Sequence, residues 1–127
     1  MFEKLELTRM AQAMAAQAGA RMGVIAQNVA NADTPGFKAM DMPSFAETYA
    51  DEAGHMRATR PGHSTDADVA MTPLPRQDKG ATAPNGNSVS LETEMVKAAG
   101  ARQDHEMALA IYRNTSDIIR ASLGRSR

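Results

Sequence analysis

The 127-residue sequence has no cysteine and no tryptophan, and only 4% of its residues are aromatic. The absence of cysteine excludes disulfides, thiol catalysis and zinc sites built on thiolates. Much of the 43% hydrophobic share is Ala and Met, which is poor material for a compact globule. We therefore expect one small domain, residues 1–127, that does not bury all of its apolar surface within itself.

A strong charge of one sign and a long hydrophobic run are also missing. The net charge is −1 and the basic residues are spread along the chain, which argues against a phosphate-binding or nucleic-acid-binding surface. Near the N-terminus, Arg9, Gln12, Gln17 and Arg21 interrupt every apolar stretch, so no cleaved signal peptide and no membrane span is predicted. A protein of this kind that works outside the cytoplasm must leave by a route that reads no such signal.

The N-terminal part, residues 1–49, begins with a predicted long helix over about residues 5–31. This stretch has no proline, is rich in strong helix formers, and places apolar residues at steps of three and four. Gly19 and Gly23 leave one strip without side-chain bulk, which we interpret as a surface for close packing of another backbone. The alternative is that the two glycines only weaken the helix. The predicted interface residues of this helix are Met14, Gly19, Met22, Gly23, Ile25 and Val29.

The C-terminal part, residues 90–127, contains a second predicted helix over residues 91–123. Ser90 is a suitable N-cap, and Glu92 and Glu94 lie in the first turn, where the helix dipole favours negative charge. Apolar residues recur at alternating steps of four and three, which is a heptad pattern. The predicted interface residues of this helix are Leu91, Met95, Leu109, Tyr112 and Ile119.

The middle segment, residues 50–89, is rich in Pro, Gly, Thr, Asp and Asn and has few large apolar residues. It offers too little apolar surface to offset the entropy of ordering, so we expect an extended, partly disordered segment in the free subunit. A neighbouring subunit could order it, for example as a short β-hairpin. The predicted fold is mostly α, with long terminal helices forming a coiled-coil-like pair whose exposed stripes pair between subunits.

The first helix is followed by a strong stop signal. Asn31 is suited to the left-handed conformation that ends helices, and Thr34 is pushed out of the helical region by Pro35. The pair Pro35–Gly36 suits the centre of a type II turn, and Phe37 follows as a large apolar anchor.

This stop signal reads ANADTPGF over residues 30–37, which resembles the N-terminal signature ANxxTPGF/Y of the flagellar rod and hook family. Residues 85–95, NGNSVSLETEM, are similar to the lead-in to the last helix in the proximal-rod members of that family. The resemblance therefore covers both ends of the chain. The resemblance implies that six residues belong to the family motif and take part in assembly: Asn28, Asn31, Thr34, Pro35, Gly36 and Phe37.

The resemblance implies a structural subunit of the flagellar basal body, in the periplasmic rod, that polymerises through its terminal helices and helps to transmit torque from the MS ring to the hook. The implied partners are further copies of the chain, FlgC-like rod subunits, FliE-like and FliF-like MS-ring proteins, and the flagellar type III export gate. Export from the cytoplasm would need no cleaved signal peptide. Phe45 and Tyr49 resemble an element that contacts the export gate. No catalytic residue, cofactor or metal is implied.

Other interpretations remain open. The chain could be another axial protein of the same family, FlgC-like, or a secreted coiled-coil interaction protein. A metal or hydrolase site could be drawn from His55, His63, Asp66 and Asp68, whose side chains are chemically competent. They lie in the Pro- and Gly-rich middle, where no rigid frame is predicted to hold the geometry that such a site needs.

Overall fold

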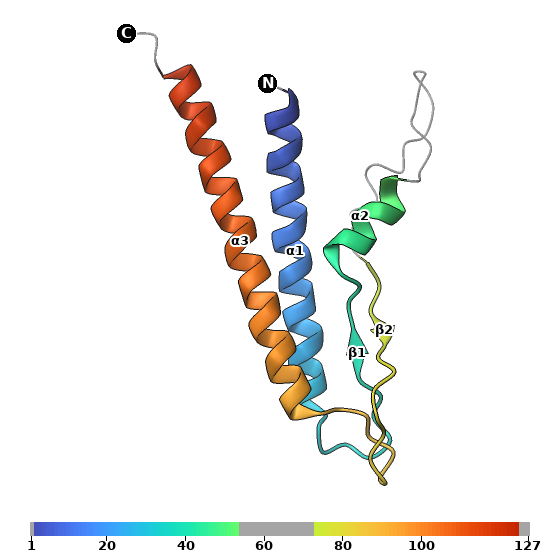
Figure 1. Ribbon diagram of the computed structural model, residues 1–127. Coiled ribbons are helices and arrows are strands. Elements are labelled where there is room, and N and C mark those ends of the chain that lie inside the picture. The colour runs from blue at the N-terminus through green and yellow to red at the C-terminus, as the bar shows by residue number, and fades with distance from the viewer. Residues whose placement is uncertain (1, 54–72, 125–127) are drawn as a thin grey trace.

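The computed structural model describes residues 2–53 and 73–124. Its elements are helix α1 (Phe2–Ala30), strand β1 (Met40–Asp41), helix α2 (Phe45–Ala53), strand β2 (Arg76–Gln77) and helix α3 (Leu91–Leu123). The two long helices lie side by side and run in opposite directions, and the turns that follow α1 and precede α3 meet at one end (Figure 1). This confirms the predicted mostly α fold with a pair of long terminal helices.

The contact between α1 and α3 has buried side chains at intervals of seven residues, and most of them are small. Its buried positions are Ala11, Ala18 and Ile25 on α1, and Glu94, Ala101, Ala108 and Thr115 on α3. A seven-residue repeat keeps one side of each helix facing its partner, and alanine lets the two backbones approach closely. The predicted heptad spacing is therefore present in the pair.

On α3 the buried line is displaced from the stripe of large apolar residues that the sequence pattern picks out. Leu91 is 51% exposed and Met95 is 72% exposed, whereas Ala101 and Ala108 are fully buried. The predicted stripe was defined by the large hydrophobic side chains of α3, but the two helices make contact mainly through small side chains. The large residues therefore flank the contact or face outward.

The ends of the helices are closed by local hydrogen bonds. The Oγ of Ser90 accepts a hydrogen bond from the backbone N–H of Thr93, which confirms the predicted N-cap of α3. At the end of α1 the prediction for Asn31 is wrong, because the described residues with positive φ are Gly36 and Gly86 and neither is Asn31. Instead, the Asn31 side chain donates to the carbonyl of Gln27 at 2.9 Å, which also accepts the Asn31 backbone N–H at 3.2 Å.

The predicted turn at Pro35–Gly36 is confirmed. Gly36 has φ of +74°, and the N–H of Phe37 donates to the carbonyl of Thr34 at 3.2 Å. This is the arrangement of a type II turn, which places glycine at its third position. The chain therefore reverses directly after α1.

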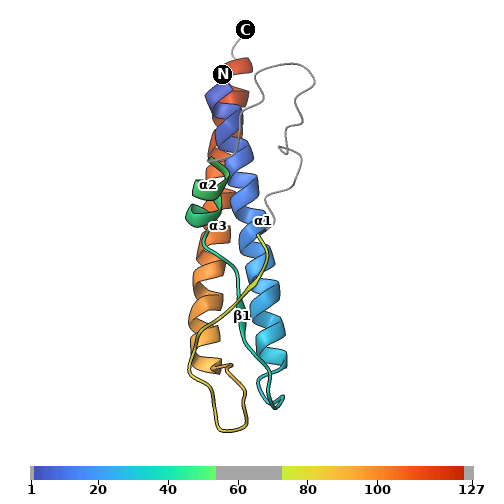
Figure 2. The ribbon, with the colours of Figure 1, turned by 90° about the vertical axis from the view of Figure 1, so that its right-hand side faces the viewer.

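After the turn, two extended segments, residues 37–44 and 73–80, run alongside α1, and we call them the strap (Figures 1 and 2). They pair through β1 and β2, which are antiparallel with Met40 opposite Gln77 and Asp41 opposite Arg76. An extended middle with a short two-stranded sheet is thus confirmed. The first strand comes from residues 40–41, outside the middle segment, because the turn directs this stretch back along α1.

Helix α2 directly follows the first strap segment. It spans the boundary between residues 49 and 50 that was predicted to separate the N-terminal part from the middle. It starts with a capping box, in which the Oγ of Ser44 accepts from the N–H of Glu47 and the N–H of Ser44 donates to Glu47 Oε2. The Ser-x-x-Glu spacing was a usable signal in the sequence. Of the segment predicted to be partly disordered, residues 50–89, residues 54–72 lie outside the described residues. In residues 73–89, the N–H groups of Asp78 and Ser88 donate to the carbonyls of Ala39 and Phe37.

Candidate functional site

The family-like motif after α1 and the lead-in to α3 meet at one end of the helix pair. We call this region, residues 28–41 and 85–94, the junction. At its centre lies Asn28, which is 1% exposed. Its Nδ2 donates to the Met40 carbonyl at 2.7 Å and to Glu94 Oε2 at 3.0 Å, and its Oδ1 accepts from the Met40 N–H at 3.1 Å. One buried amide thus joins α1, β1 and α3 and uses both of its donors.

Asn87, in the C-terminal half of the chain, is a second buried amide that joins the two segments of the junction. It is 3% exposed, and its Nδ2 lies 2.8 to 3.0 Å from the carbonyl oxygens of Asn31, Ala32 and Thr34. Its Oδ1 accepts from the N–H of Val89 at 2.7 Å. Carbonyl groups at a helix C-terminus lack partners within the helix. Asn87 supplies partners to the carbonyls at and just beyond the end of α1.

Backbone hydrogen bonds complete the docking of the two segments. The N–H of Gly36 donates to the Asn85 carbonyl at 3.1 Å, and the N–H of Ser88 donates to the Phe37 carbonyl at 3.0 Å. The N–H of Ala39 donates to the buried Ser88 Oγ at 2.9 Å. Residues from opposite ends of the sequence therefore form one continuous hydrogen-bonded layer.

Two glycines allow the turns to touch. Gly36 and Gly86 have φ of +74° and +84°, which side chains rarely tolerate. A Cβ added at Gly86 would lie 3.3 Å from the Cα of Gly36. The close approach of the two turns therefore depends on glycine at position 86, whereas a Cβ added at Gly36 would meet no atom within 4 Å and glycine is favoured there by its positive φ.

The structure gives each predicted motif residue a place in this layer or in the turn that leads into it. Asn28 is at its centre, Asn31 and Thr34 present carbonyls to Asn87, and Gly36 makes the turn. Pro35 is exposed beside it, and Phe37 is half-buried. The sequence pattern indicated a turn but missed Asn87, Ser88 and Glu94, whose partners lie more than 45 residues away. The NGN triplet of residues 85–87 was the one available signal.

A cluster of charged side chains lies beside the junction, where the strap meets the helices; we call it the polar cluster. Arg21 holds Asp41 with two hydrogen bonds, Nε to Oδ1 at 3.1 Å and Nη2 to Oδ2 at 3.2 Å. The Nζ of Lys97 lies 2.6 Å from Asp78 Oδ2, 3.2 Å from Glu94 Oε1 and 3.3 Å from Asp41 Oδ2. Two cations thus neutralise most of the charge of three carboxylates.

The pKa values in this cluster follow from burial and pairing. Burial by itself raises the pKa of Asp41, but hydrogen bonds from Arg21 and from the Met42 N–H, with the charges of Arg21 and Lys97, bring that pKa below its usual 3.8. Burial lowers the pKa of Lys97, but its hydrogen bonds to Asp78 and Glu94 and the neighbouring negative charge outweigh this and raise it above 10.5. Both groups are stabilised in their charged forms.

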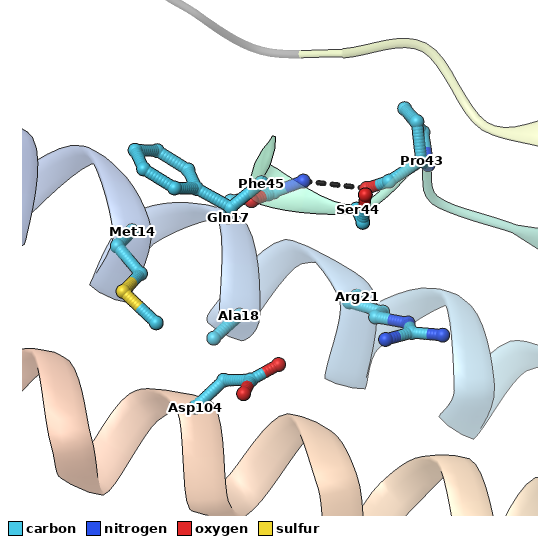
Figure 3. A pocket seen from close by; sticks show the side chains of 8 residues that line it. All are labelled: Met14, Gln17, Ala18, Arg21, Pro43, Ser44, Phe45 and Asp104. Atoms are coloured by element: carbon cyan, nitrogen blue, oxygen red, sulfur yellow. Dashed lines mark hydrogen bonds between the residues drawn. The ribbon is translucent and has the colours of Figure 1, made fainter. Parts of the chain in front are cut away.

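The predicted export-gate residues lie on α2 close to α1. The rings of Phe45 and Tyr49 are 6.0 Å apart between centroids, with Phe45 half-buried and Tyr49 49% exposed. Figure 3 shows Phe45 near Met14 and Gln17, with the Gln17 Nε2 donating to the Pro43 carbonyl at 2.5 Å. The structure places the pair at an accessible surface beside the strap.

Two hollows on the described surface offer little room or chemistry for a substrate. The one in Figure 3 has a volume of about 50 Å³, enough for a few waters but far below a small-molecule pocket. It is lined by Met14, Gln17, Ala18, Arg21, Pro43, Ser44, Phe45 and Asp104. A wider depression of about 480 Å³ borders only Leu5, Glu6, Thr8 and Arg9, so no groups from a second element converge there.

The alternative metal or hydrolase residues His55, His63, Asp66 and Asp68 lie outside the described residues. Within residues 2–53 and 73–124, no three His, Cys, Asp or Glu side chains are arranged to hold a metal ion. Nor is any helix of this part of the chain long and apolar enough to cross a membrane.

The predicted interface residues differ in exposure within the single chain. Ile25 is buried in the helix pair, and a group is half-buried at its edges: Met14, Met22, Leu109 and Ile119. The exposed members are Gly19, Gly23, Val29, Leu91, Met95 and Tyr112. A Cβ added at Gly19 or Gly23 would meet no atom within 4 Å. Within the described residues, no other part of the chain therefore packs on the strip that these glycines leave open.

Comparisons with known proteins point to one family. Residues 10–38, which include most of α1 and the turn after it, match the family model described as "Flagella basal body rod protein". Over 119 residues, 88% of this chain and 88% of the relative, the sequence is 26% identical to "Flagellar basal body rod protein FlgB" of Agrobacterium fabrum. The second match extends the likeness to most of the chain.

Proposed function

We propose that this chain, which belongs to the family of flagellar basal-body rod proteins, is an FlgB-like subunit of the proximal rod. As a member of this family it is a structural component of the flagellar basal body. In the proposed role it polymerises through its two terminal helices and passes torque from the MS ring toward the hook. The chain performs no catalysis in this role.

The observation that carries the proposal is the junction. The motif after α1 and the lead-in to α3 use their buried amides, Asn28 and Asn87, to hold each other. They thereby align two long helices whose contact is lined mainly by small residues. A unit of this kind supports long helices at a fixed register without enclosing them, which suits a subunit of a stiff polymer.

The helices retain outward-facing apolar side chains that the chain itself does not cover. Near the junction they include Val29 at 44%, Leu91 at 51%, Met95 at 72% and Val96 at 73% exposed. Exposed apolar surface of this extent on a subunit is typical of protein–protein contacts. We propose that these residues, with the open strip at Gly19 and Gly23, contact neighbouring rod subunits.

The proposed neighbours are further copies of this chain, FlgC-like rod subunits, and FliE-like and FliF-like proteins of the base. We further propose that Phe45 and Tyr49 contact the type III export gate and that the chain reaches the periplasmic rod without a cleaved signal peptide. The exposed ring of Tyr49 on an accessible helix supports the gate contact.

Deleting the gene in the source bacterium, with and without a plasmid copy, tests the rod role. We expect loss of swimming and of rods and hooks in purified basal bodies, both restored by the plasmid. Normal flagella in the deletion strain would contradict the role.

The variants Gly19→Ala and Gly23→Ala test the proposed contact strip. Since an added methyl meets no atom of the chain, each should stabilise the isolated subunit by about 0.5–1 kcal/mol in urea unfolding. In the cell each should nevertheless reduce motility, because the methyl group holds the neighbouring backbone away. Gly100→Ala on α3 is the matched control, also without a close neighbour. Full motility of both variants would remove the strip from the interface.

A further inference from the structure

The strap depends on the helices for its position. β1 and β2 pair over two residues each, and the residues of β2, Arg76 and Gln77, are both exposed. A two-stranded ribbon of this length is not stable alone in water. What fixes the strap is therefore its set of contacts with α1 and α3.

Most of these contacts are polar. Gln17, Arg21 and Asn28 of α1 bind Pro43, Asp41 and Met40 of the first strap segment through side-chain hydrogen bonds. Ala39 and Met42 add apolar contact, since they are only 2% and 5% exposed. On the second segment, Asp78 is tied to Lys97 of α3 at 2.6 Å.

Lys97 occupies a special position among these contacts. Within the part of the chain that the structure describes, it is the one helix side chain with ion pairs to both strap segments, to Asp41 in the first and to Asp78 in the second. Its third partner is Glu94, which is 2% exposed. Removing its charge leaves three carboxylates with Arg21 as the one remaining cation of the polar cluster.

The helix pair also has its own contact between α1 and α3. The buried line from Ala11 to Ile25 on α1 and from Ala101 to Thr115 on α3 lies between the two helices. Segments held by few apolar contacts and by partly exposed polar groups open locally before a protein unfolds as a whole.

We propose that Lys97 is the positioning residue that sets the opening of the strap, so that loss of its ion pairs releases the strap while α1 and α3 remain paired. Opening uncovers the polar side of the helix pair, including Arg21 and Asn28. It also carries α2, which directly follows the first strap segment, away from Met14 and Gln17. This inference concerns the subunit alone and does not depend on the proposed function.

Amide hydrogen exchange of the full chain tests it with Lys97→Met, which keeps an unbranched apolar side chain and removes the charge. The reporters for the strap are the N–H groups of Ala39, Met40 and Asp78, each of which donates a hydrogen bond in the closed strap. We expect their exchange to become at least about tenfold faster, while amides at the centres of α1 and α3 change less than about twofold. Unchanged strap amides, or equal acceleration in the helices, would overturn the proposal.

Two further variants make the result specific. Arg102→Met is the matched control, since Arg102 lies on the same helix but is exposed and forms its ion pair, among the described residues, with the neighbouring Glu106. It should leave strap exchange unchanged. Asp78→Asn breaks the shortest ion pair of Lys97 without leaving a buried helix charge unpaired, and it should accelerate the same three amides to a smaller extent. Loss of strap protection in Arg102→Met, or full protection in Asp78→Asn, would contradict the role of Lys97.

Discussion

At the junction end of the molecule, the N- and C-terminal halves of the chain are joined by buried side-chain amides and glycine turns. Toward the end that carries the termini, they touch through alanines and a threonine, while Leu5, Ile118 and Leu123 remain more than half exposed. Hydrogen bonds are directional and define one register, whereas apolar contact is tolerant of sliding. The comparison teaches that the junction sets the geometry of the subunit and that the rest of the helix pair leaves apolar surface free for other contacts.

The substitution Asn28→Ala should have the largest effect and tests whether the junction sets the geometry of the subunit. It removes both partners of the Met40 backbone and leaves Glu94 without one of its donors in a buried site. We expect a loss of about 3 kcal/mol in the free energy of unfolding, measured with urea. Gln27→Ala, an exposed neighbour on the same helix turn, should cost less than about 0.5 kcal/mol. An equal loss in the free energy of unfolding for the two variants would show that the junction contributes no more to stability than the exposed surface of α1.

Gly86→Ala should have the next largest effect. Its methyl group would lie 3.3 Å from the Gly36 Cα, and its φ of +84° disfavours any side chain. We expect a loss of about 1–2 kcal/mol. Gly100→Ala in α3 should instead gain about 0.5–1 kcal/mol, as expected for a helical glycine with open space. A stabilised Gly86→Ala would contradict the close approach of the two turns.

The stability of the junction end should also depend on pH through the polar cluster. The pKa of Asp41 is lowered in the folded chain, so its contribution is present above the usual 3.8 and is lost as pH falls through the lower folded value. The pKa of Lys97 is raised, so its contribution is intact below 10.5 and is lost as pH rises through the folded value. Urea midpoints should therefore fall at both extremes, and Asp41→Asn should flatten the acid side. An unaltered acid limb in that variant would exclude Asp41 as its source.

The smallest effect is expected for Met95→Ser on the outer face of α3. Because Met95 is 72% exposed, the stability of the isolated subunit should change by less than about 0.5 kcal/mol. In the proposed rod, the same substitution should weaken assembly, which basal-body purification would detect. A large loss of stability in the isolated chain would show that Met95 packs within the subunit.

The predictions made from the sequence succeeded where the signal is local. The bounds of α3 and the cap at Ser90 follow from residues that are neighbours in the chain, as does the turn at Gly36. The capping box of α2, between Ser44 and Glu47, is local as well. The stripe of large apolar residues predicted on α3 lies beside the buried line of Ala101 and Ala108, with Leu109 and Ile119 half-buried at its edge. Its pairing with other subunits stays a prediction.

The sequence by itself determined that this chain has two long helices, a turn after the first, and a family-like motif at that turn, because capping, turn geometry and helix periodicity act between residues a few positions apart. Only the tertiary structure decided that Asn87 closes the end of α1, that Asn28 reaches Glu94, and that Lys97 bridges both segments of the strap. These contacts join residues far apart in the sequence, and each depends on the antiparallel course of the helices. A side-chain amide or ammonium group has no preferred partner until the fold brings one within hydrogen-bonding distance.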